Sequence, residues 1–328
     1  MTLPTEQVEL SVCPVESSTH TTRDIMRNFL SQCQIPLQRG VPLDPTFHQE
    51  CANVLIEDYL KPSAAVTLEN LPSLMSSFNP FLTLGVRMAS TGYAHLTHTP
   101  TRVYVALFTA LLVCLDDIFP ENVELMCGFN ERFIKNETQG EPILDAVAGL
   151  LRSTSKYFSM LSSNLIVTSA LNYVTSLSLD QGLHSIKLAE HSRNFARLCR
   201  NMSGIPEAFA AFVFPPEVPF TAYIQCFPDL YTYANYVNDV LSFYKEDIAG
   251  ETENLVSILA QTQPNSSRYQ VLQQLADEAA AANANIRDIL SDQKSILDAY
   301  DAFRVGFVQF HIDSPRYRLA ELFPCIDG

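Results

Sequence analysis

The stretch Asn235-Tyr-Val-Asn-Asp-Val-Leu-Ser-Phe-Tyr-Lys-Glu246 decides how the rest of the chain is interpreted. Within it Asn238, Ser242 and Glu246 are four residues apart, and four residues turn a helix by about 400°, so the three side chains share one face. An amide oxygen, a hydroxyl and a carboxylate form a hard-oxygen site of low charge, which suits Mg²⁺ that also binds water and a substrate phosphate. Lys245 can place a positive charge near the same phosphate.

The same spacing is also typical of the solvent-exposed face of an amphipathic helix. The flanks favour a buried helix instead, because apolar residues surround the polar ones almost completely. A buried Asn, Ser and Glu require partners, and a metal ion would supply one. The flanking residues are Tyr231, Tyr233, Tyr236, Val237, Val240, Leu241, Phe243 and Tyr244.

A second acidic site, Asp116 and Asp117, ends an apolar helix that the periodicity predicts over residues 101–118. The two carboxylates repel each other and face the negative end of the helix dipole, so a divalent cation or an arginine pair is expected to compensate them. A solvated helix end is the alternative. In a helical bundle Asp116 and Asn238 can flank one cavity from opposite walls. Two metal sites in an apolar pocket fit a diphosphate head with a hydrocarbon tail.

Candidate cations lie elsewhere in the chain. Arg200 is followed by Gly204, and a glycine inside a helix costs about 1 kcal/mol relative to alanine, so a local break is predicted there. Near the C-terminus Arg316 and Tyr317 follow a proline, and both side chains donate well to phosphate oxygens. Taken singly, each of these residues is more typical of an ordinary surface position.

Composition excludes several classes of protein. With 328 residues and 47% hydrophobic content, a sizeable core is possible. A net charge of −15 without a basic run disfavours nucleic acid and anionic membranes as partners. The glycine-rich phosphate loops of Rossmann and P-loop proteins are absent from the sequence. The pair His95 and His98 lacks the glutamates of a di-iron bundle.

Cysteine usage and hydropathy favour a soluble protein of the cytoplasm. The 8 cysteines form no CxxC pair, so reduced, buried thiols are expected rather than a zinc site or a disulfide framework. The first residues lack the basic start and apolar core of a signal peptide. The longest apolar run, Val103 to Leu115, is too short to span a bilayer, so no membrane insertion is expected.

Helical periodicity without an alternating strand pattern predicts an all-α, single-domain helical bundle around a central apolar cavity. Residues 1–20 are predicted to form a flexible N-terminal arm and residues 21–328 the domain. Asn79-Pro80 predicts a break, since the residue before a proline avoids the helical region. The candidates to line the cavity are Phe81, Tyr93, Phe108, Phe212, Tyr231, Asn235 and Phe310. For any single candidate, core packing is the favoured interpretation.

Together, the aspartate pair, the Arg200…Gly204 step, the 235–246 stretch and Arg316-Tyr317 resemble the class I terpene cyclases, and most of all the fungal trichodiene synthase family. The similarity covers most of the chain, from about residue 70 to 320, in order and spacing. It implies the class I terpenoid synthase fold, three Mg²⁺ ions, and farnesyl diphosphate as substrate. A sesquiterpene synthase of secondary metabolism is therefore expected, a lyase that cyclises the farnesyl cation to a hydrocarbon or alcohol.

The resemblance also implies roles at the metal site. Asp116 would bind two of the ions, whereas Asp117 would pair with Arg316 and help to signal closure. The third ion would be chelated by Asn238, Ser242 and Glu246.

Further roles concern the diphosphate. By analogy with bacterial relatives, Gly204 would mark a helix break that helps to trigger ionisation. Dimers are common in the family, so a homodimer is one candidate assembly. The diphosphate would be held by Arg200, Lys245, Arg316 and Tyr317.

Two departures from the family pattern predict a relative of trichodiene synthase with a different product. The acidic segment reads Asp-Asp-Ile-Phe-Pro-Glu, where trichodiene synthase carries further aspartates. Glu121 is a candidate replacement, although Pro120 could turn it away. The interval from Arg200 to Asn238 also looks a few residues shorter.

Two other functions stay open at this point. A chain-elongating prenyltransferase would use the same helical scaffold, but it normally carries two aspartate-rich motifs. Here the second motif is Asn/Ser/Glu, which favours cyclisation. A catalytically silent all-α binding protein would instead show no Mg²⁺-dependent release of diphosphate.

Overall fold

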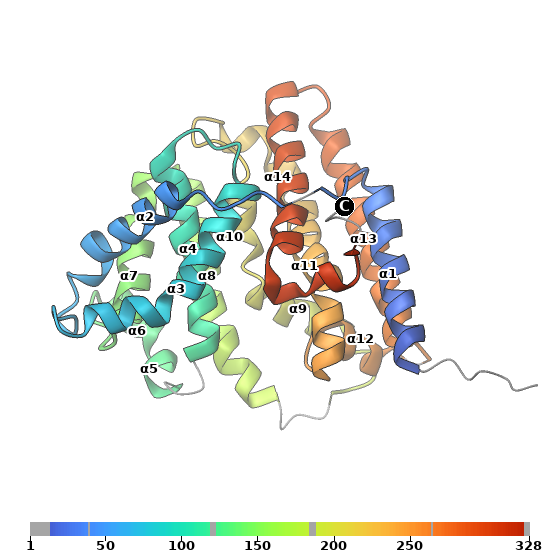
Figure 1. Ribbon diagram of the computed structural model, residues 1–328, viewed down its shortest axis with the longest axis horizontal. Coiled ribbons are helices and arrows are strands. Elements are labelled where there is room, and N and C mark those ends of the chain that lie inside the picture. Colours follow the sequence, from blue (N-terminus) through green and yellow to red (C-terminus); the bar gives the residue numbers. More distant parts are fainter. Residues whose placement is uncertain (1–13, 39, 119–122, 184–187, 264, 325–328) are drawn as a thin grey trace, which may run out of the picture.

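The computed structural model describes residues 14–38, 40–118, 123–183, 188–263 and 265–324, which fold into a bundle of packed helices (Figure 1). No strand occurs in these ranges, and the predicted all-α fold is confirmed. The helices are α1 (Pro14–Gln32), α2 (Pro45–Val54), α3 (Leu71–Thr91), α4 (Thr99–Ile118), α5 (Val123–Cys127), α6 (Phe129–Ile134), α7 (Pro142–Ser153), α8 (Met160–Leu183), α9 (Arg193–Ser203), α10 (Pro206–Ala211), α11 (Phe227–Ala249), α12 (Leu255–Thr262), α13 (Arg268–Ile289) and α14 (Lys294–Asp313).

Helix α11, which carries the 235–246 stretch, lies inside the bundle and contacts α1, α9, α10, α12, α13 and α14. Pro228 lies in its first turn, where a missing N–H costs nothing, and Gly250 ends it with a φ of +73°. Most of its residues are buried, as its apolar flanks predict. Other helices begin at side-chain caps, such as Glu141 on the Leu144 N–H and Ser267 in a capping box with Gln270.

Helices α3 and α4 pack closely and form one wall of the bundle. A side chain at Gly85 would lie 2.1 Å from the Ala106 carbonyl oxygen, so only glycine permits this approach. Helix α3 differs from the prediction because it continues through Pro80. Phe78 and Leu82 on either side of the proline are buried, and their packing offsets the backbone hydrogen bond that proline removes.

The N-terminal boundary also differs from the prediction. Helix α1 begins at Pro14, inside the stretch 1–20 expected to be a flexible arm, and residues 1–13 lie outside the described ranges. The end of α1 is joined to α14 because the Arg304 guanidinium donates to the Cys33 carbonyl at 2.7 Å. The six cysteines within the described ranges form no disulfide bonds. In the described helices, apolar stretches fall short of what a bilayer-spanning segment requires.

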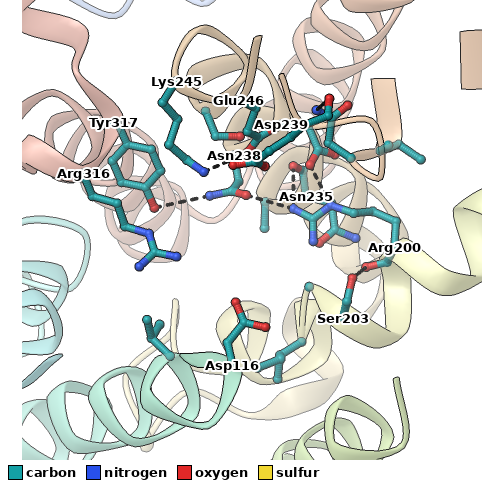
Figure 2. Close-up of a pocket in the computed structure, with 18 of the residues that line it drawn as sticks. Asp116, Arg200, Ser203, Asn235, Asn238, Asp239, Lys245, Glu246, Arg316 and Tyr317 are labelled. Carbon is teal, nitrogen blue, oxygen red and sulfur yellow. Dashed lines mark hydrogen bonds and ion pairs between the residues drawn. The ribbon is translucent and has the colours of Figure 1, made fainter. Parts of the chain in front are cut away.

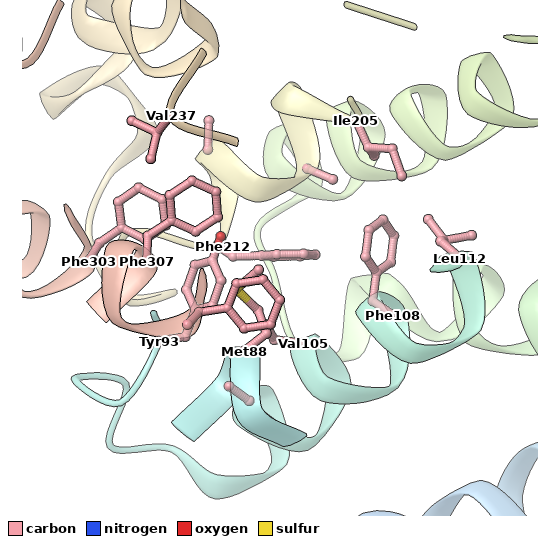
Figure 3. Packing of buried hydrophobic residues seen from close by; sticks show 14 of the residues in the cluster. Met88, Tyr93, Val105, Phe108, Leu112, Ile205, Phe212, Val237, Phe303 and Phe307 are labelled. Atoms are coloured by element: carbon pink, nitrogen blue, oxygen red, sulfur yellow. The ribbon is translucent and has the colours of Figure 1, made fainter. Parts of the chain in front are cut away.

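An aromatic cluster fills the core between α4, the end of α10 and α14 (Figure 3). Its centre is Phe212, which is fully buried. The Phe212 ring meets those of Phe108 at 5.1 Å, Phe158 at 5.2 Å and Tyr93 at 6.0 Å between centroids. The pairs with Phe108 and Tyr93 are edge-to-face, the geometry that aromatic quadrupoles favour.

We expect Phe212→Ala to lower the free energy of unfolding by about 3–5 kcal/mol, because it leaves a cavity among rings that cannot collapse into it. Urea denaturation followed by circular dichroism measures this loss. The matched control is Phe195→Ala on α9, where the ring is 37% exposed and the expected change is within about 0.5 kcal/mol. Equal losses in the two variants would contradict the placement of Phe212 at the centre of the core.

Candidate active site

An open cavity of about 840 Å³ lies between α3, α4, α8, the α9–α10 junction, α11 and α14. Helix α4 contributes Thr109, Leu112 and Asp116, which follow one another along its cavity face toward its C-terminal end. Apolar side chains line much of the remaining wall, and charged side chains lie near Asp116. The apolar lining residues include Leu84, Met88, Leu112, Tyr173, Leu177, Phe209, Phe307 and Phe310.

The three polar residues of α11 with four-residue spacing all line this cavity, so the predicted shared face exists. Ser242 is buried, whereas Asn238 and Glu246 are half-buried. Figure 2 shows Asp116 on α4 across the cavity from Asn238, Lys245 and Glu246 on α11. The structure therefore brings the two acidic motifs to opposite walls of one cavity, although they are far apart in sequence.

Asp116 projects into the cavity from the C-terminal end of α4. Loss of hydration beside the cavity wall raises the pKa of Asp116, and the neighbouring Asp117 raises it further. Arg316 and Lys245 oppose this by attracting the ionised carboxylate. The compensating positive charge expected from the sequence is thus supplied in part by these two side chains. Asp117 is exposed and is not part of the cavity lining, and no ion pair joins it to Arg316 in the described part of the chain.

Arg200 is held against α11 by contacts along one edge of its guanidinium. Its Nε donates to the Asp239 carboxylate at 2.7 Å, and its second terminal nitrogen donates to the Asn238 amide oxygen at 3.0 Å and to the Asn235 carbonyl at 3.2 Å. The other terminal nitrogen takes part in none of these contacts. Arg200 lines the cavity, so this nitrogen is available to an anion bound there.

The predicted helix break after Arg200 is present. Helix α9 ends at Ser203, and Ile205 adopts a left-handed φ of +51° before α10 begins at Pro206. A β-branched residue rarely adopts this conformation, so the junction stores strain. A side chain at Gly204 would lie 2.0 Å from the Asn235 amide oxygen and 2.4 Å from the Arg200 guanidinium. A side chain at Gly204 would therefore displace the side chains of Asn235 and Arg200, which both line the cavity.

The remaining predicted cations also face the cavity. Lys245 pairs with Glu246 at 3.2 Å, and both side chains are mostly shielded from solvent. Arg316 and Tyr317 lie in the short 3₁₀ turn Pro315–Tyr317 that follows α14, and Figure 2 shows them beside Asn238 and Lys245. Tyr317 is buried, which raises its pKa to about 12 and keeps its hydroxyl protonated as a hydrogen-bond donor. Glu121 lies outside the described residues.

The prediction of apolar lining residues was correct for some positions and wrong for others. Asn235 and Phe310 line the cavity. Phe108 and Phe212 lie one layer behind it, packed edge-on against Phe209, which does line it. The residues named as candidates that are absent from the described lining are Phe81, Tyr93, Phe108, Phe212 and Tyr231.

Two buried polar residues support the site and were not predicted. Burial raises the pKa of Asp239 to about 6 even though Arg200 opposes this, and its second carboxylate oxygen has no hydrogen-bond partner in the described chain. His311 on α14 is fully buried and contacts the Asn238 amide at 3.1 Å. Burial lowers the pKa of His311 to about 4, so the ring is neutral near pH 7. For Asp239, the only signal in the sequence that could have suggested a role in the site is its position next to Asn238.

The donor chemistry of this cavity fits a hard divalent cation. Asp116, Ser242 and Glu246 offer oxygen atoms from two walls, and Asn238 adds an amide oxygen. Among the described residues no three His, Cys, Asp or Glu side chains converge as a metal cluster. A cation here would thus be bound by neutral oxygens and single carboxylates, which leaves coordination positions for water and phosphate.

Comparison with known proteins gives consistent matches. Residues 82–327 match the family model of trichodiene synthase. An alpha-cuprenene synthase from Coprinopsis cinerea is 33% identical over 92% of this chain and 90% of its own length. A monoterpene synthase from Postia placenta is 31% identical over 95% of this chain and 90% of its own length. Similarity to trichodiene synthase of Fusarium sporotrichioides is lower, 22% over 66% of this chain and 59% of that protein.

The solved structures include a linalool/nerolidol synthase from Streptomyces clavuligerus. It superimposes with a TM-score of 0.61, covers 84% of this chain and 98% of its own, and is 13% identical. At that identity the likeness concerns the fold alone, and it confirms the predicted fold class.

Proposed function

We propose that this chain, which belongs to the trichodiene synthase family of terpene cyclases, is a Mg²⁺-dependent sesquiterpene synthase that ionises farnesyl diphosphate and cyclises the resulting cation. Membership of the family makes it a lyase acting on a prenyl diphosphate. Within this activity we propose a fifteen-carbon substrate, three Mg²⁺ ions and a cyclic product.

The observation that carries the proposal is the arrangement of charge around one cavity. Oxygen donors on α4 and α11 face each other across it, and three cationic side chains surround them. Apolar side chains from α3, α4, α8, α10 and α14 form much of the remaining wall, and the segment 250–254 after α11 adds polar ones. This division matches a substrate with a charged diphosphate and a hydrocarbon chain. The cationic residues are Arg200, Lys245 and Arg316.

The metal ions would be held by Asp116 on one wall and by Asn238, Ser242 and Glu246 on the other. When bound, Mg²⁺ neutralises the negative charge that develops on the leaving diphosphate. Arg200, Arg316 and the Tyr317 hydroxyl donate to its oxygens and add to this stabilisation. The allylic carbon–oxygen bond then breaks, and its electron pair leaves with the diphosphate.

The cation left behind is controlled by the apolar part of the cavity. Side chains such as Leu112, Phe209 and Phe307 exclude water, which would otherwise capture the cation. Aromatic faces stabilise a cation by about 0.5–2 kcal/mol each. The shape of this lining folds the hydrocarbon chain. Cyclisation ends when a proton is lost, giving a hydrocarbon, or when water adds, giving an alcohol.

The test is incubation of the purified protein with farnesyl diphosphate, in Mg²⁺ or in EDTA, followed by gas chromatography–mass spectrometry of the extract. A cyclic C15 hydrocarbon or alcohol formed only with Mg²⁺ is expected. Geranyl diphosphate is the matched comparison, because one relative is named a monoterpene synthase. A higher kcat/KM with geranyl diphosphate would overturn the proposed substrate, and no product from either would overturn the proposed activity.

A further inference from the structure

The side chain of Asn238 is held at both ends by partners from other helices. Its amide nitrogen contacts the Nε2 atom of His311 on α14 at 3.1 Å, and it lies 3.5 Å from the Tyr317 hydroxyl. Its amide oxygen accepts from Arg200 on α9 at 3.0 Å. Asn238 itself is on α11, so three separate segments meet at this one amide.

The hydrogen bonds of His311 determine which of its nitrogens can accept. Its Nδ1 atom lies 2.7 Å from the Phe307 carbonyl oxygen, and a carbonyl oxygen can only accept. Nδ1 therefore carries a proton. Nε2 faces the Asn238 amide nitrogen, which can only donate, so Nε2 presents a lone pair. Only the amide nitrogen of Asn238, and not its oxygen, can face that lone pair favourably.

The opposite end of the amide is determined independently. A guanidinium donates and never accepts, so Arg200 must face the Asn238 oxygen. Reversing the amide would place its oxygen against the His311 lone pair and its NH₂ group against the Arg200 donors. The two partners thus select the same orientation, in which the amide oxygen is the atom held on the Arg200 side of the cavity lining.

The surroundings of His311 also fix the ring itself. It is fully buried, with the Phe307 and Phe310 rings meeting it edge-on at 4.8 Å and 5.1 Å and the Tyr317 ring at 4.5 Å. All three neighbouring aromatic residues line the cavity. A ring enclosed in this way has no alternative position from which to contact Asn238, and solvent does not compete for its lone pair.

We propose that His311 is a positioning residue that fixes the Asn238 amide with its oxygen available to Mg²⁺. The inference rests on the proposed role of Asn238 as a metal ligand. His311 touches neither metal nor substrate and acts only through the amide nitrogen. Partners of this kind, one layer behind a metal ligand, typically change metal affinity by about 10–100-fold when they are replaced.

Two amide substitutions separate this role from simple packing. In His311→Gln the side-chain carbonyl oxygen extends about as far as Nε2 and can accept from Asn238. In His311→Asn the shorter side chain can still donate to the Phe307 carbonyl but does not reach Asn238. Gln309→Leu, on the same helix, is the control, because Gln309 is buried and contacts Asp313 and the Gln38 carbonyl instead.

The measurement is Mg²⁺ binding to the full chain in the presence of inorganic pyrophosphate, by isothermal titration calorimetry, with melting temperature as a second readout. We expect His311→Asn to weaken Mg²⁺ binding about 10–100-fold, and His311→Gln and Gln309→Leu to stay close to the wild type. Wild-type affinity in His311→Asn, equal weakening in both His311 variants, or unfolding of both would overturn the inference. A wild-type protein that itself fails to bind Mg²⁺ with pyrophosphate would instead count against the proposed function.

Discussion

Replacing Glu246 with glutamine is expected to lower the rate of diphosphate release by at least about 100-fold, because it removes the only carboxylate among the three ligands on α11. The structure predicts little effect on folding. Among the residues that the structure describes, the Glu246 carboxylate has one ion-pair partner, the adjacent Lys245, and glutamine has nearly the same shape. The variant is therefore expected to melt within a few degrees of the wild type. Pyrophosphate release in a coupled assay and circular dichroism measure the two quantities.

The matched control is Glu57→Gln, in which a glutamate paired with Lys61 at 2.7 Å lies on the surface away from the cavity. It should leave both the rate and the melting temperature unchanged. Glu246 is a cleaner test than Asn238, because Asn238 also holds Arg200 and His311, and its loss would disturb both. Wild-type turnover in Glu246→Gln would remove Glu246 from the metal site.

Gly204→Ala is expected to lower turnover about 100-fold, the cost typical of displacing a catalytic group by about 1 Å. The added methyl group would lie 2.0 Å from the Asn235 amide oxygen and 2.4 Å from the Arg200 guanidinium, so both must move. The φ of Gly204 is −83°, which alanine adopts freely. The expected loss of turnover therefore comes from steric overlap of the methyl group and not from backbone strain. Overpacking of this kind also costs about 1–3 kcal/mol of stability.

Gly182→Ala is the matched control for this substitution. Gly182 lies in the last turn of α8, and a side chain there would meet nothing within 4 Å. Because alanine is a better helix former, the control should be neutral or slightly stabilising. Steady-state kinetics and thermal melts of the two variants make the comparison. If Gly204→Ala retained full turnover, the close approach of α9 to α11 would not matter for the reaction.

The sequence alone was sufficient for the metal-site candidates, and the reason is geometric. A helix repeats closely after four residues, so the spacing of Asn238, Ser242 and Glu246 fixes their common face wherever the helix lies. The helix break at Gly204 could likewise be predicted, because a glycine in a helical pattern indicates a break or a close approach. The all-α fold followed from a helical period that recurs along most of the chain.

The lining of the cavity could not be predicted in the same way. Helix α4 is buried on nearly every face, so its periodicity does not reveal whether Phe108 or Leu112 faces the cavity. Only the packing of α3 and α10 decides this. Pro80 likewise interrupts no helix, because tertiary burial of its neighbours overrides a local preference. The role of His311 could not be predicted from the sequence, because its contact with Asn238 joins residues on separate helices.

The central claim is that oxygen atoms on α4 and α11 hold divalent cations and a diphosphate between them. The most direct test is an anomalous difference map from crystals grown with Mn²⁺, which binds ligands of the same type as Mg²⁺, and inorganic pyrophosphate. We predict manganese peaks beside Asp116 and beside Asn238, Ser242 and Glu246, with pyrophosphate between them. Pyrophosphate bound without manganese at these oxygens, or manganese bound only elsewhere, would contradict the claim.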